Sequence, residues 1–201
     1  MVKNYVEWLK VNWWGVCPIL GIFLFIFMFA FVKNADPVLF VILLNVPLYL
    51  FHESEEYIFP GGFRKFFNLD IFKSGDALMP LETNFIYKIN ILMIWVLLPV
   101  FGLLSIIDYR FGLWICYFEF FAGVAHIILT IKAKKKYNPG LIMSVFVNIP
   151  FGIYAVWFMT EQGLIVNPWI NVHMIIGFLL NAMLPIMGLR IYKKWRANYG
   201  M

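Results

Sequence analysis

The chain has 201 residues, of which 63% are hydrophobic and 13% charged, and its formal net charge is +5. A soluble domain is typically about half apolar and about a quarter charged, so this composition excludes an ordinary soluble protein. A bilayer core about 30 Å thick requires about 20 apolar residues per helical crossing, and the chain contains several such runs. We therefore expect an all-α, polytopic bundle of transmembrane helices that forms a single domain over residues 1–201.

The apolar runs predict about six crossings in chain order, at residues 13–32, 37–57, 89–107, 111–131, 141–160 and 168–192. The first run is too long for the apolar region of a secretory signal and lacks a convincing cleavage site, so we interpret it as a retained helix. The longest connection is 58–88. Its aromatic and aliphatic residues share one helical face, which predicts an amphipathic segment at the membrane interface; they are Phe63, Phe66, Phe67 and Ile71.

The basic residues are distributed unequally between the two sides of this topology. Of the 16 Lys and Arg residues, only Lys33 and Arg110 fall on the side opposite the termini. Because Lys and Arg accumulate in cytoplasmic loops, we expect both termini to be cytoplasmic in a multi-pass protein of the cell membrane. Topology and attraction to lipid headgroups account for these charges, so the expected partner is membrane lipid and not nucleic acid. The sequence predicts no oligomeric state.

Ionisable residues inside membrane segments are costly and tend to mark functional sites. The second crossing ends with the sequence His52-Glu53-Ser54-Glu55-Glu56. Residues three and four positions apart lie on one side of a helix, so His52, Glu55 and Glu56 are expected to converge, with Glu53 pointing aside. Asn45 lies two turns earlier on the same stripe.

The fourth crossing carries Glu119 and His126, also seven residues apart. His52 and His126 each lie fifteen residues into their helices, so we expect them at similar depth near the cytoplasmic face. His173 enters from the opposite face and is not expected to join them.

Two neutral imidazoles and two carboxylates form a ligand set suited to Zn, Fe or Mn. We therefore predict that His52, Glu55, Glu56 and His126 bind a divalent transition metal. One of the two carboxylates would remain free as a catalytic base. Two other interpretations stay open: the glutamates could be wetted by headgroup water and paired with nearby basic residues, and Glu119 could be a hydrogen-bonded carboxyl that holds helices together.

The same residues resemble the HXXEE-domain family of membrane proteins. That family is defined by H-x-x-E-E, which matches His52 to Glu56, and it has a further histidine and a Tyr-x-Pro-Gly motif, similar to His126 and residues 137–140. The resemblance implies a multi-helical membrane protein with a site around these residues, but no assigned reaction. Tyr137, Pro139 and Gly140 are expected to support that site, as are Asn45 and Glu119 on the physical argument alone.

The leading hypothesis is a metal-dependent membrane enzyme, a hydrolase or an oxidoreductase, that acts on a lipid or another apolar substrate near the cytoplasmic leaflet. The alternatives are a small transporter or ion and proton carrier, and a non-catalytic membrane scaffold.

Overall fold

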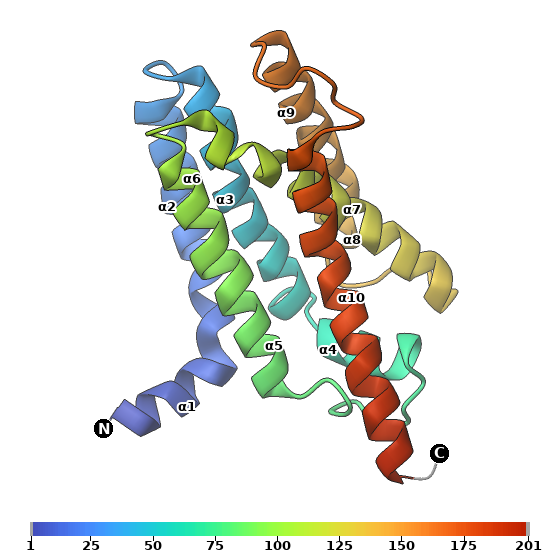
Figure 1. Ribbon diagram of the computed structural model, residues 1–201. Coiled ribbons are helices and arrows are strands. Elements are labelled where there is room, and N and C mark those ends of the chain that lie inside the picture. Colours follow the sequence, from blue (N-terminus) through green and yellow to red (C-terminus); the bar gives the residue numbers. More distant parts are fainter. Residues whose placement is uncertain (1, 200–201) are drawn as a thin grey trace.

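The computed structural model describes residues 2–199, which are built from helices and contain no strand. Six helical stretches are long and apolar enough to cross a membrane: Asn4–Val32, Pro37–Tyr57, Thr83–Leu104, Tyr109–Ala133, Leu141–Glu161 and Val172–Asn198. The N-terminal helix and the last turns of the final helix lie at the same end of the bundle (Figure 1). The fold prediction of an all-helical, multi-pass membrane protein is confirmed.

The first stretch bends near Trp13. It consists of α1 (Val2–Asn12), a short 3-10 turn, α2 (Cys17–Phe27) and a π-helical turn that ends at Val32. α1 carries charged residues, among them Lys10 and Glu7, which form an ion pair of 2.7 Å, and it diverges from the line of α2 (Figure 1). The helix therefore extends beyond the predicted crossing, which begins at residue 13.

Two helices form the centre of the bundle, α3 (Pro37–Tyr57) and α7 (Leu113–Ala133). The apolar window of the α3 stretch is 72% buried and that of the α7 stretch 50%, against 11% for α10 (Val172–Tyr199). α2 packs on α3, whereas α9 (Ile149–Glu161) and α10 pack on α7. Polar side chains on α3 and α7 are therefore held inside protein and away from lipid.

The connection after α3 differs from the prediction. α4 (Phe63–Phe66) and a π-helical turn (Phe67–Ile71) are followed by a loop, and α5 (Thr83–Asn90) begins the third stretch six residues before the predicted start at 89. Phe66 and Phe67 are buried in the protein core, so part of the predicted interfacial face packs on protein.

Arg64 anchors this connection. Its guanidinium donates to the carbonyls of Leu78 and Leu81 at 2.6 and 2.8 Å, and to the hydroxyl of Thr83 at 2.7 Å. These hydrogen bonds hold the loop after α4 against Arg64. The interpretation that nearby basic residues pair with the glutamates of α3 is therefore not supported for Arg64.

The third and fifth stretches are each assembled from consecutive pieces. The third continues from α5 through a π-helical segment (Ile91–Leu97) into α6 (Leu98–Leu104). A short 3-10 turn (Tyr109–Phe111) leads into α7. The fifth begins with α8 (Leu141–Met143), passes through a π-helical turn (Ser144–Asn148) and continues as α9. The first turn of the fifth stretch, at α8, lies beside the end of α3 and forms one wall of the site.

Candidate metal centre

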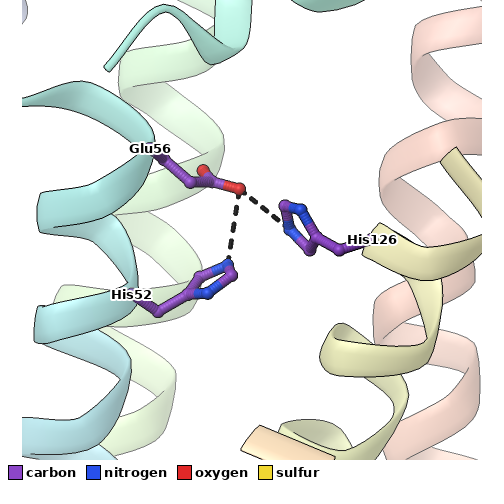
Figure 2. A group of neighbouring side chains, drawn as sticks. All are labelled: His52, Glu56 and His126. Carbon is purple, nitrogen blue, oxygen red and sulfur yellow. Dashed lines mark ion pairs between the residues drawn. The ribbon is translucent and has the colours of Figure 1, made fainter. Parts of the chain in front are cut away.

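Three predicted ligands meet between α3 and α7: His52, Glu56 and His126 (Figure 2). One oxygen of Glu56, Oε1, lies 3.0 Å from Nε2 of His126 and 3.4 Å from Nε2 of His52. Each of the three residues is at most 5% exposed. His52 and Glu56 are one helical turn apart on α3, and α7 brings in His126 from the opposite side.

The spacing of these atoms suits a single ion. The three ligand atoms lie within 4.8 Å of one another. Metal bonds of about 2.0–2.2 Å to imidazole nitrogen and carboxylate oxygen place two ligands of one ion roughly 3 to 3.5 Å apart. The two distances to Glu56 are therefore those expected of a metal site. Only the separation between the two imidazole nitrogens would have to change on binding.

Asn138 orients His126. Its amide nitrogen donates to the backbone carbonyl of His126 at 2.8 Å and to the hydroxyl of Thr130, so its oxygen faces Nδ1 of His126, at 2.7 Å, as an acceptor. Nδ1 must therefore carry the proton of a neutral ring, and Nε2 presents its lone pair to Glu56.

His52 has a similar support. With the amide of Asn148 oriented to satisfy both neighbours, its oxygen accepts from Nδ1 of His52 at 3.3 Å and its nitrogen donates to Glu119 at 3.2 Å. Nε2 of His52 is again the free acceptor, and it has no hydrogen-bond partner among the described residues. Such outer contacts hold the imidazoles of metal sites in the correct tautomer.

With both rings neutral, the centre brings together three acceptors with no donor between them. A carboxylate oxygen and two imidazole lone pairs at these distances repel one another and have lost their water. A cation placed among them converts this repulsion into attraction, and deprotonated carboxylate with neutral imidazole is the state in which a metal binds. The residues present fit a transition metal.

Gly140 brings the loop before α8 directly against both rings. Its φ is +97°, in the left-handed region that favours glycine, and a Cβ atom there would lie 2.4 Å from Cε1 of His126 and 2.9 Å from Cε1 of His52. The Tyr-x-Pro-Gly motif thus has a physical explanation at its last position, and Pro139 is buried.

Glu55 does not enter this group. Its Oε1 accepts from the hydroxyl of Tyr137 at 2.8 Å and from the backbone of Ile142 at 3.0 Å, and its Oε2 accepts from the backbone of Met143 at 2.7 Å. The carboxylate thus closes the N-terminal turn of the fifth helical stretch. Burial raises the pKa of the Tyr137 phenol, and its hydrogen bond to Glu55 raises it further.

The predicted supporting residues lie at different distances from the centre. Asn45 is fully buried and donates to the carbonyls of Val41 and Ile42, two turns away from His52. Glu119 is fully buried and reaches His52 only through Asn148.

His173 lies at the start of α10, outside the group of possible ligands, as the sequence suggested.

Sequence reasoning missed three residues of the site. Asn138 sits at the unspecified position of the Tyr-x-Pro-Gly motif, which could have marked it. Asn148 lies outside both motifs. Glu53 lies outside the group of possible ligands, as expected, but its place in the wall of a cavity next to Glu56 was not predicted.

That cavity has a volume of about 360 Å³ and lies against the centre. Glu53, Glu56 and His126 contribute to its wall, and so does Phe63, whose ring centroid lies 5.6 Å from that of His126. Most of the remaining wall is apolar, so the centre faces a space suited to an apolar molecule.

A family model described as a protein of unknown function with HXXEE motif matches residues 43–155, more than half of the chain. The match covers the centre with its supporting asparagines and the residues that hold Glu55. No curated protein matches the chain. No solved structure matches it either.

Proposed function

The chain belongs to the HXXEE family, and we propose that it is a metal-dependent membrane enzyme that acts on an apolar substrate. One observation carries this proposal: three buried acceptors from His52, Glu56 and His126 face one another, with the rings oriented by Asn138 and Asn148. A buried group of acceptors is costly without a cation, and the geometry favours a metal as that cation.

Two histidines and one carboxylate leave coordination positions for water or substrate. This set occurs in hydrolytic zinc enzymes and, as a facial triad, in non-haem iron oxygenases. A bound ion would supply a Lewis acid and an activated water, or oxygen activation if it is iron. Hydrolase and oxidoreductase are therefore both retained, and the identity of the metal selects between them.

The other residues of the motif take supporting roles in this proposal. Glu55 holds Tyr137 and the start of α8, because both of its oxygens already accept hydrogen bonds. We therefore assign Glu55 a positioning role in place of the predicted role as ligand or base. Gly140 allows the same loop to pack on both imidazoles.

The adjacent cavity supports an apolar substrate. Its volume of about 360 Å³ lies within the range of about 300–1,000 Å³ typical of small-molecule sites. Helices long enough to cross a membrane form most of its walls, so a lipid-soluble molecule can enter it from the bilayer.

A proton carrier is the second candidate, because Oε2 of Glu53 and Oε2 of Glu119 are buried without hydrogen-bond partners among the described residues. A proton could take the place of the metal between Glu56 and the imidazoles. Proteoliposomes separate the two functions: a pH gradient that wild-type protein dissipates, but a Glu56→Gln variant does not, would favour the carrier.

We infer the orientation of the protein in the membrane from its basic residues. The protein end that carries both termini is assigned to the cytoplasm, because all but two of the Lys and Arg residues fall on that side. Single cysteines at the exposed positions Lys33, Arg110 and Gln162 should react from outside, and one at Lys135 only after permeabilisation. Reversed accessibility of the two sets would contradict this assignment.

The enzyme proposal is tested by elemental analysis of detergent-purified protein prepared without chelator and offered Zn, Fe or Mn. Wild type should retain the metal, and so should the control His173→Ala, whose histidine lies outside the centre. A folded wild type that retains none of the three metals would overturn the proposal.

A further inference from the structure

Glu53 is a buried carboxyl that the proposed metal centre does not use. Its side chain is 1% exposed, and Oε2 has no hydrogen-bond partner among the described residues. It borders the cavity together with Glu56, three residues along α3, and with His126. The cavity therefore has a carboxyl group in its wall, next to the centre.

The remainder of the cavity is largely apolar. Tyr57 and Asn90 also line it, but they satisfy each other through a hydrogen bond of 3.1 Å. Much of the rest of the wall comes from the connection after α4 and from α5, α7 and α10, with Phe67, Phe85, Ile86, Ile89, Leu129 and Leu184 as examples. Two further polar residues line the wall: Asn181, whose amide donates to the carbonyls of Phe118 and Gly177, and Lys132. The carboxyl of Glu53 is thus placed in a pocket whose wall is mostly suited to hydrocarbon.

The cavity also reaches the outer surface of the bundle within its membrane-spanning length. Two of its lining residues, Ile128 on α7 and Phe178 on α10, are exposed at that surface. α10 packs mainly on α7 and is the least buried of the six stretches. A molecule dissolved in the bilayer therefore has access to the cavity from the side.

We propose that this cavity binds an amphiphile with one hydrocarbon chain and a terminal hydrogen-bond donor, a hydroxyl or an amine, which donates to Glu53. The apolar wall accommodates the chain, and the donor pairs with the carboxyl group of Glu53. A hydroxyl or an amine can both donate and accept, so it pairs with this carboxyl in either protonation state, whereas an ether or an ester can only accept and is disfavoured. The identification of this ligand as the substrate rests on the proposed function; the binding itself does not require the metal.

The test uses full-length protein in nanodiscs and photoactivatable C12 probes that share one tail and differ only in the head: alcohol, amine, methyl ether and plain alkane. The alcohol or the amine, or both, should label α5 and α10 more strongly than the ether and the alkane. Glu53→Leu should weaken saturation by the preferred donor probe roughly tenfold, the equivalent of about 1.4 kcal/mol, and leave alkane labelling unchanged.

Two further variants control for folding and position. Glu161→Leu removes an exposed carboxylate at the end of α9 and should label like wild type. Ala182→Trp fills the cavity from α10 and should reduce labelling by every probe. Equal labelling by alcohol, amine and ether, or an unchanged saturation curve in Glu53→Leu, would overturn the inference.

Metal content is measured on the same samples, so that a failure of the amphiphile inference can be distinguished from a failure of the proposed metal-dependent function. Metal retention without donor-selective labelling removes the amphiphile inference and leaves the metal centre. Donor-selective labelling of a metal-free protein supports the cavity inference and contradicts the proposed enzyme.

Discussion

The two ends of the bundle use buried and half-buried polar groups differently. At the end opposite the termini, Asp36 accepts from the backbone of Leu39 and from the hydroxyl of Tyr109, both at 2.9 Å. Nearby, Asp108 accepts from the guanidinium of Arg110, and these hydrogen bonds lower the pKa of the carboxyl to about 2. In these pairs each carboxylate has its donor, and the contacts cap helices and close a turn.

At the candidate metal centre the acceptors instead lack donors. The amide oxygens of Asn148 and Asn138 accept from the outer nitrogens of His52 and His126, so the protons of the neutral rings lie away from Glu56. The inner atoms face one another as acceptors. Buried polar groups without hydrogen-bond partners occur mainly at functional sites. The two ends therefore differ in whether their polar groups have such partners, and not in polarity alone.

The largest expected effect is on metal binding. Glu56→Ala and His126→Ala should each remove most of the bound metal, because each deletes one of three ligands. Asp108→Asn, at the other end, should retain the full content. Elemental analysis of matched preparations checks this difference, and equal metal in Glu56→Ala would show that the ion binds elsewhere.

Gly140→Ala should be nearly as severe. The new Cβ would overlap His126 and His52, and a residue other than glycine held at φ +97° costs of the order of 1–3 kcal/mol. We expect a lower thermal midpoint together with weakened metal binding. Gly163→Ala is the matched control, because it has a positive φ of +72° but no atom within 4 Å of the added carbon. If both variants lose metal equally, backbone strain and not ring displacement is responsible.

Asn138→Ala should lower metal affinity about 10- to 100-fold, the usual effect of losing a group that orients a ligand histidine. Asn148→Ala should have a smaller effect, since its contact with His52 is longer, at 3.3 Å against 2.7 Å. Competition with a chelator of known affinity gives both values. An unchanged affinity in Asn138→Ala would remove the tautomer argument for His126.

Tyr137→Phe should reduce stability by about 0.5–1.5 kcal/mol through loss of one hydrogen bond, while the metal content stays the same. Glu55 keeps its two backbone donors, from Ile142 and Met143, in this variant. Chemical denaturation in detergent measures the change. A loss of metal without a loss of stability would indicate that Glu55 is a metal ligand.

The smallest effect is expected from the ion pair at the opposite end. The folded pKa of Asp108 is about 2, below the ordinary value of about 3.9. Its contribution is therefore complete above pH 4 and disappears as the pH falls toward 2. The thermal midpoints of wild type and Asp108→Asn should differ slightly at pH 6 and converge near pH 2. A difference that grows as the pH falls would have the wrong sign.

The six helical stretches were predictable because a bilayer imposes a minimum apolar length, which the sequence shows directly. The residues at which these stretches begin and end were not predictable. Polar residues such as Thr83 and Lys88 continue the third stretch beyond its apolar part, and the last helix continues to Tyr199 for the same reason. The packing of Phe66 and Phe67 onto protein depends on tertiary contacts that no local pattern contains.

Periodicity and depth predicted that His52, Glu56 and His126 lie together, and Glu55 shows the limit of that method. Adjacent residues on a helix point about 100° apart, so Glu55 and Glu56 cannot both face His126. Glu56, one turn from His52, meets His126, while Glu55 faces α8. The roles of Asn138 and Asn148 were not predictable, because they depend on how distant segments approach each histidine.

X-ray absorption on metal-loaded protein measures the coordination shell and tests the central claim most directly. The account predicts nitrogen and oxygen ligands at about 2.0–2.2 Å, with the outer-shell scattering of two imidazoles. One imidazole should be lost in whatever metal His126→Ala retains. A shell that contains sulfur at about 2.3 Å, or one without imidazole, would contradict a metal held by His52, Glu56 and His126.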